Sequence, residues 1–199
     1  MNPSSAGFGN ETVQQQNEAR EAKRRADNAK KAREAADELF PGEKWIKEEE
    51  RIFVSPRRKR GNFEEELKDA KILRDFGSTV YLVPENNRQP GTKYDAIVNG
   101  MKFEFKNVGG NANTLANHFL RSRSQAPNVF INLETSNLSR NEVMDTLYNV
   151  RNSVIHTNKY GKNIKGYAER NKFHGGRIIL KLKGHKNLIY LNVDDLKSL

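Results

Sequence analysis

The sequence contains no cysteine among its 199 residues, which excludes disulfides and thiolate metal sites and fits a reducing compartment. No apolar run approaches the roughly 20 residues that a membrane-spanning helix needs, so we expect a soluble protein without a membrane partner. The N-terminal stretch MNPSSAGFGNETVQQQ has no basic segment followed by an apolar one, and it therefore predicts no secretory signal.

Histidine and large apolar residues are also scarce. The four histidines form neither HxxxH nor HExxH spacing, so a structural zinc site is not expected; they are His118, His156, His174 and His185. Hydrophobic residues make up 35% of the chain, which is low for a chain that is globular throughout. Part of the chain is therefore expected to be extended or disordered.

Positive charge is in excess, with a formal net charge of +10. Residues 1–50 hold 9 Lys/Arg against 11 Asp/Glu, whereas residues 51–199 hold 26 against 14, so the excess lies on the later part. A basic globular unit attracts polyanions, and nucleic acid is the commonest of these. Charge alone fits a merely soluble basic domain almost as well.

The composition changes near residue 50. Residues 1–16 are small and polar and predict a disordered tail. Residues 17–40 are rich in Ala, Glu, Lys and Arg, and they predict a helix that is polar all round. We interpret residues 1–49 as this tail and a solvated helical arm, and residues 50–199 as the folded domain.

The later part alternates helical and strand patterns. Helices are predicted over 62–76, 113–125 and 140–154, and strands over 52–55, 78–85, 94–98, 101–108, 128–133, 177–183 and 187–193. The expected fold class is α/β, with a mixed central sheet flanked by helices and an N-terminal polar helical arm.

Asn99-Gly100 is the strongest turn signal in the chain, because both residues of a type I′ turn need a positive φ. A two-residue turn at this point fixes the register of the hairpin and sets Asp95 directly opposite Glu104. Strand alternation then gives one wholly apolar face, expected to meet the core. That face comprises Tyr94, Ala96, Val98, Met101, Phe103 and Phe105.

The other face of the hairpin carries Asp95, Glu104 and Lys106. Like charges in opposed positions destabilise a sheet, and a bridging cation relieves the repulsion. Mg²⁺ and Mn²⁺ prefer oxygen ligands of this kind, and an ion so held can activate water beside a phosphodiester. The same pattern also fits an amphipathic hairpin whose solvated face happens to carry these residues.

A third carboxylate comes from the helix predicted over 62–76. Glu66 falls within the apolar stripe of this helix, and a carboxylate aimed inward needs a partner because burying a lone charge is costly. The alternative is a surface run of acids, Glu64 to Glu66, favoured by the dipole at the start of the helix.

Taken in order, these residues resemble the PD-(D/E)XK nuclease superfamily: an acidic helix ending at Gly77, a strand, Asp95, and then Glu104-Phe105-Lys106. The stretch EEELKDAKILRDFGSTVYLVPENN…GTKYDAIVNGMKFEFKNV is similar to the C-terminal tRNA nuclease domains of contact-dependent growth inhibition and related polymorphic toxins, and SRSQAPNVFINLE also suits that family. The resemblance spans about residues 50–199, with Tyr94 standing where the superfamily has proline.

The resemblance implies roles for individual residues. Asp95 and Glu104 would bind a divalent ion, Mg²⁺ or Mn²⁺, Glu66 would complete its shell, and Lys106 would be the catalytic lysine. Gln125 would orient the substrate or the lysine, although a satisfied polar residue at a helix end is an equal alternative. It also implies tRNA as the preferred nucleic acid over DNA, an immunity protein as a partner, and action in the bacterial cytoplasm as part of an exported toxin.

Three functions stay open at this point: a tRNA-cleaving toxin, a metal-dependent DNA endonuclease of the same superfamily, and a nonenzymatic nucleic-acid-binding module. The last is disfavoured by the intact Asp95, Glu104 and Lys106. Candidate phosphate contacts, each of which is equally a solvated surface base, are Arg121, Arg123, Lys181 and Lys183. The sequence predicts no oligomeric state.

Overall fold

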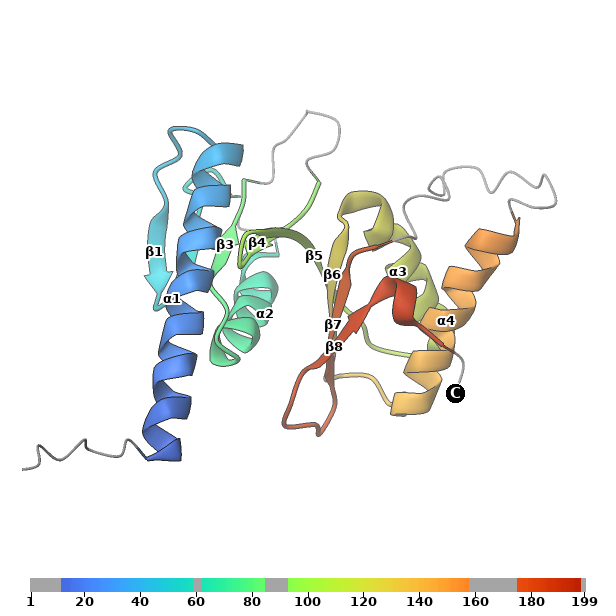
Figure 1. Ribbon diagram of the computed structural model, residues 1–199. Coiled ribbons are helices and arrows are strands. Elements are labelled where there is room, and N and C mark those ends of the chain that lie inside the picture. The colour runs from blue at the N-terminus through green and yellow to red at the C-terminus, as the bar shows by residue number, and fades with distance from the viewer. Residues whose placement is uncertain (1–11, 59–61, 85–92, 158–174, 198–199) are drawn as a thin grey trace, which may run out of the picture.

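The computed structural model describes residues 12–58, 62–84, 93–157 and 175–197. Within these ranges eight strands form a single mixed sheet, and strands that follow one another in the sequence are neighbours in it (Figure 1). The strands are β1 (Ile46–Glu49), β2 (Ile52–Val54), β3 (Val80–Leu82), β4 (Ala96–Val98), β5 (Met101–Asn107), β6 (Asn128–Leu133), β7 (Arg177–Leu182) and β8 (Ile189–Asn192). The pairs β2–β3, β5–β6 and β6–β7 are parallel, and the other pairs are antiparallel.

Helices cover both faces of this sheet, which confirms the predicted α/β class. They are α1 (Val13–Leu39), α2 (Phe63–Asp75), α3 (Ala112–Gln125) and α4 (Arg140–Thr157), followed at the end of the chain by the short η3 (Val193–Asp195). The apolar side of α2 packs against the face that carries Phe103, Phe105 and Phe130. The helices α3 and α4 pack against the opposite face, which carries Val129 and Ile131.

The helix α1 is not the solvated arm that its composition predicts. Ala32 and Ala36 are fully buried, and together with Phe40 they pack against aromatic and aliphatic side chains of the sheet. Alanine lets a helix approach closely without presenting the large apolar stripe that sequence patterns detect. The first half of α1 is exposed, as predicted, but its helix already begins at Val13, inside the expected disordered tail. Residues 1–11 of that tail lie outside the described residues.

The predicted domain boundary between residues 49 and 50 falls inside a hairpin. The strand β1 pairs with β2 in antiparallel fashion and forms the edge of the sheet. This strand escapes sequence analysis because it is four residues long and three of its residues are charged. The part of the chain before residue 50 therefore contributes both a strand and a packed helix to the fold. No helix in the described ranges is long and apolar enough to cross a membrane.

Candidate active site

The hairpin β4–β5 forms around the predicted turn. Asn99 and Gly100 have φ values of 51° and 86°, as a type I′ turn requires. The ladder keeps the predicted register from the turn out to Ala96, which lies opposite Phe103. The turn chemistry alone thus fixes which side chains of β5 share a face.

Beyond Ala96 the register changes, because the main-chain N–H of Asp95 also bonds the carbonyl of Phe103, at 3.0 Å. Two residues of one strand oppose one of the other, which is the geometry of a β-bulge. The extra residue turns Tyr94 to the opposite face, where its ring packs beside Phe40 of α1. The continuous alternation predicted for this strand, with Tyr94 on the apolar face and Asp95 in direct ladder pairing with Glu104, is therefore wrong.

The bulge also determines how the carboxylate of Asp95 is held. Its Oδ2 accepts a hydrogen bond of 2.8 Å from the main-chain N–H of Phe105. Its Oδ1 lies 3.7 Å from the guanidinium of Arg58. One oxygen is therefore fixed to β5, the strand that carries Glu104 and Lys106, and the carboxylates remain neighbours although they are not a ladder pair.

Glu104 is almost completely buried, with 2% of its surface exposed. The ammonium of Lys106 contacts Oε1, whereas Oε2 is buried and has no hydrogen-bond partner among the described residues. Burial and the negative charge of Asp95 raise the pKa of Glu104 to about 8, although Lys106 opposes this shift. In the absence of a further cation, this carboxyl group is mostly protonated at neutral pH.

Arg58 belongs to this site but is not among the residues that the sequence predicts for it. Its guanidinium is buried, donates to the carbonyl of Asp95 at 3.0 Å, and also contacts the carbonyl of Val83. It forms an ion pair with Glu66, in which Nε and the carboxylate are 2.7 Å apart. Only its place in the basic turn PRRKRG marks Arg58 in the sequence, and nothing local distinguishes it from its neighbours.

Glu66 does need a partner, as its inward position predicts, but the partner in the structure is Arg58. Its side chain is 13% exposed and neutralises a guanidinium that is 1% exposed. The resemblance assigns Glu66 to the shell of a metal ion together with Asp95 and Glu104. In the described part of the chain, no three Asp, Glu, His or Cys side chains gather in a geometry that could hold an ion.

Three of the predicted residues lie on α3, and they differ in how far they are buried. Arg123 is buried, with its guanidinium donating to the carbonyls of Pro127 and Gly175, the latter at 3.0 Å, so its predicted phosphate contact is replaced by a structural role. Burial lowers its pKa to about 10. Arg121 is exposed on the same helix, and Gln125, its last residue, is half-buried.

Lys181 and Lys183 lie away from the hairpin carboxylates. Lys181 is level with Asn132 of β6, whereas Lys106 is level with Ile131, so Lys181 and Lys106 face opposite sides of the sheet. The ammonium of Lys181 donates to the carbonyl of His185 at 2.6 Å. That of Lys183 donates to a side-chain oxygen, 2.7 Å away, in the segment between β6 and α4. These two candidate phosphate contacts therefore do not lie together with Asp95 and Glu104.

His118 of α3 is a further neighbour of the site. It is half-buried, and its pKa is lowered by burial and by the positive charges of Lys106 and Arg121. The helix therefore brings an imidazole to the side of the sheet where Lys106 lies. A lone histidine in a helix gives no motif, so sequence analysis had no signal for it.

Asp69 forms a second buried acidic centre, on the other face of the sheet. It is fully buried on α2, and its two oxygens accept hydrogen bonds from the amides of Asn132, at 2.8 Å, and Asn107, at 3.0 Å. Burial raises its pKa to about 7, although both amides oppose this shift. The network ties α2 to β5 and β6. In the sequence, only the spacing of three residues between Glu66 and Asp69 could have indicated that Asp69 also points inward.

Asp95 and Glu104 fit a small divalent cation. Mg²⁺ is commonly held by one or two carboxylates, with waters and substrate phosphate oxygens completing its octahedron, so a third protein carboxylate is not required. The buried Oε2 of Glu104 meets no protein donor in the described part of the chain and lies beside a second carboxylate, so a cation that displaces the proton of Glu104 would satisfy both groups. Both residues offer the hard oxygen ligands that Mg²⁺ and Mn²⁺ prefer.

The chain matches no protein-family model and no curated protein. Among solved structures, it is similar to a CdiA-CT/CdiI toxin and immunity complex from Burkholderia pseudomallei. The two are 19% identical with a TM-score of 0.42, over 69% of this chain and 91% of the other. A likeness of this size establishes no shared activity.

Proposed function

We propose that this protein is a metal-dependent nuclease that hydrolyses phosphodiester bonds, with tRNA as its preferred substrate. The observation that carries the proposal is the buried, unpartnered Oε2 of Glu104, next to Asp95 and on the strand that carries Lys106. Without an ion, two acids lie side by side in the interior, and burial and the charge of Asp95 keep the proton on Glu104, which is a costly arrangement if it serves stability alone. A site that binds a cation there removes this cost.

In this proposal each side chain has one task. Asp95 and Glu104 bind the ion, which when bound polarises the phosphodiester and promotes ionisation of water. Glu104 must lose its proton to do so, because its pKa is about 8 without the ion. Lys106 donates to substrate or to developing negative charge once it is released from Glu104. Arg58 keeps Asp95 in position through its carbonyl and its carboxylate.

The choice of substrate has separate support. The net charge of +12 on residues 51–199 favours a polyanion. The resemblance of residues 50–199 to tRNA nuclease domains of growth-inhibition toxins favours tRNA, and it extends the proposal to a toxin that acts in the bacterial cytoplasm and is neutralised by an immunity protein. The same arrangement of Asp95, Glu104 and Lys106 serves DNA equally well, so DNA is the competing substrate.

The proposal is tested by incubating the full chain with tRNA or plasmid DNA, in Mg²⁺ or in EDTA. We expect tRNA to be cut at one or a few positions in Mg²⁺ only, with duplex DNA left intact. Lys106→Met should lower the cleavage rate at least a hundredfold. The matched control is Lys102→Met, which removes a lysine from the same strand and face.

Two results would contradict parts of this proposal. Cleavage of duplex DNA with tRNA untouched would make the protein a DNA endonuclease. Undiminished cleavage by Lys106→Met, or equal losses in the Lys106 and Lys102 variants, would remove the assigned site. Circular dichroism of each variant separates a lost activity from a lost fold.

A further inference from the structure

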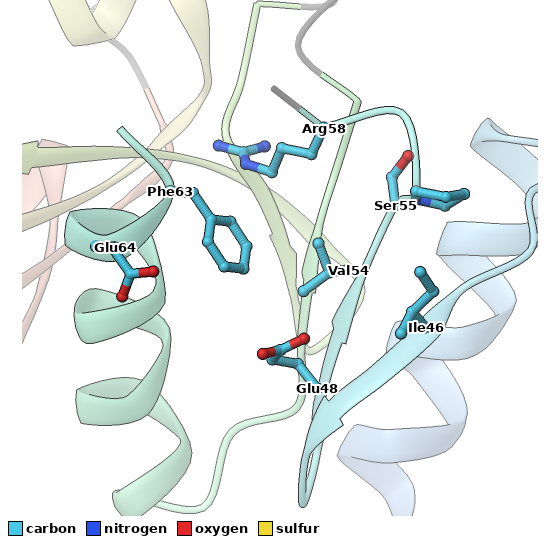
Figure 2. A pocket seen from close by; sticks show the side chains of 8 residues that line it. Ile46, Glu48, Val54, Ser55, Arg58, Phe63 and Glu64 are labelled. Carbon is cyan, nitrogen blue, oxygen red and sulfur yellow. The ribbon is translucent and has the colours of Figure 1, made fainter. Parts of the chain in front are cut away.

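A cavity of about 370 Å³ lies between the first turn of α2 and the hairpin β1–β2 (Figure 2). Ligand pockets typically have volumes of roughly 300–1,000 Å³, so this cavity can admit a small organic group. Its walls come from three segments of the chain and contain both apolar and charged side chains. They are Ile46, Glu48, Val54, Ser55, Pro56, Arg58, Phe63 and Glu64.

Arg58 connects this pocket to the candidate active site. It lines the pocket and also contacts Glu66 and Asp95. The guanidinium of Arg58 would therefore lie between a group bound in the pocket and the carboxylate of Asp95. A nucleotide whose base occupied the pocket could then extend its neighbouring phosphate along Arg58 toward Asp95.

The pocket offers apolar surface on two sides. Phe63 projects from α2, and Val54 and Ile46 project from the strands that face it (Figure 2). Ile46 is 51% exposed, although isoleucine is usually buried. A flat ring inserted between these walls would stack on Phe63 and cover Ile46, and single-stranded RNA bases commonly bind aromatic side chains in this way.

Two acids line the pocket, Glu48 on β1 and Glu64 on α2. Both are exposed, and no ion pair or hydrogen bond holds either side chain within the described part of the chain. An ionised carboxylate only accepts hydrogen bonds, and it repels phosphate. These acids therefore favour an occupant that presents N–H groups at its edge.

We propose that this pocket binds a guanine base of single-stranded RNA. Among the four RNA bases, guanine alone presents two adjacent N–H donors on its Watson–Crick edge, which match the two oxygens of one carboxylate. The proposal rests on the nuclease function in one respect only: the pocket would place the phosphate next to this guanine at Asp95. Guanine binding itself can be measured whether or not the chain cleaves RNA.

The test uses three labelled RNA pentamers, UUGUU, UUAUU and UUUUU, titrated into the full chain carrying Lys106→Met in the presence of Mg²⁺. We expect UUGUU to bind at least about tenfold more tightly than the other two. Phe63→Leu and Glu64→Gln should each reduce this preference to threefold or less, since stacking on one aromatic ring changes affinity by about tenfold or more.

Two matched controls lie on α2 and at its C-cap. Phe76→Leu alters another half-buried phenylalanine that packs on the same core cluster, and Glu65→Gln alters an exposed acid outside the pocket. Both should keep the preference for UUGUU. Equal binding of the three pentamers, or equal losses in the Phe63 and Phe76 variants, overturns the proposal.

The competing occupant is a basic side chain of a protein partner. A labelled Ala-Arg-Ala peptide is therefore titrated into the same variants. Peptide binding that requires Phe63 and Glu64, without any guanine preference, overturns the proposal in favour of a protein ligand. RNA cleavage by the wild-type chain without guanine preference refutes the pocket assignment alone, whereas guanine preference without cleavage refutes the nuclease function alone.

Discussion

Replacing Asp69 by Asn should make the stability of the protein much less dependent on pH. Asp69 is fully buried, and its pKa is raised from 3.8 to about 7, with burial as the largest cause. An acid whose pKa is raised by folding favours the folded state most below its unfolded pKa. This advantage is lost as the pH rises through the folded pKa.

The size of the effect follows from the displaced pKa. Once Asp69 is ionised in both states, a rise from 3.8 to about 7 corresponds to about 4 kcal/mol of lost folding free energy. Much of this loss falls between pH 5 and pH 8, where the wild-type chain should lose about 2–3 kcal/mol relative to the variant. Both Asn107 and Asn132 donate to Asp69, so in the Asp69→Asn variant one of these amides must turn its oxygen toward the new NH2 group. The cost of this change does not depend on pH and therefore does not affect the difference between pH 5 and pH 8.

Urea unfolding of both proteins at pH 5 and pH 8, in EDTA, measures this difference. Other titrating groups are common to the two chains and cancel in the comparison. Asp75→Asn, an exposed acid on the same helix, is the matched control and should show no comparable change. A stability difference between wild type and Asp69→Asn that stays constant from pH 5 to pH 8 would refute the argument.

Three further substitutions test the packing around the hairpin. Ala36→Asp places a carboxylate in the contact between α1 and the sheet and should cost about 3 kcal/mol or more in urea unfolding, whereas Ala26→Asp on the exposed part of α1 should cost little. Gly100→Ala should cost about 1 kcal/mol more than Gly42→Ala, because both have positive φ but only at Gly100 would a Cβ meet the main chain of α1, at 3.1 Å. Tyr94→Phe should leave the melting temperature unchanged or raise it, because the buried hydroxyl has no hydrogen-bond partner among the described residues; a clear fall would show that a partner exists.

Local chemistry explains which parts of this fold could be predicted from the sequence. The Asn99-Gly100 turn follows from the need for positive φ at two successive residues, and it fixed the faces of β5 correctly. The helices α2 and α3 lie within one residue of their predicted ends. These features depend on interactions over a few residues, which a sequence displays directly.

The errors arise where distant segments decide the outcome. The bulge at Asp95 depends on main-chain and side-chain bonds to β5 that no alternation pattern contains. The packing of α1 depends on alanines, whose small size hides a buried face. Arg58 acquires its place only because the folded chain brings Glu66 and the carbonyls beside it.

The candidate site is also distinguished from the rest of the buried polar structure by what its groups lack. Asp69 and Glu104 are both buried acids with strongly raised pKa values. Both oxygens of Asp69 accept hydrogen bonds from amides, so that network is complete and has a structural role. Glu104 has the ammonium of Lys106 on one oxygen, whereas no donor among the described residues meets the other oxygen, which lies beside the carboxylate of Asp95. Selection for stability alone would favour a hydrogen-bond donor beside Oε2. Because a second carboxylate lies there instead, we assign the proposed metal binding to Glu104 and not to Asp69.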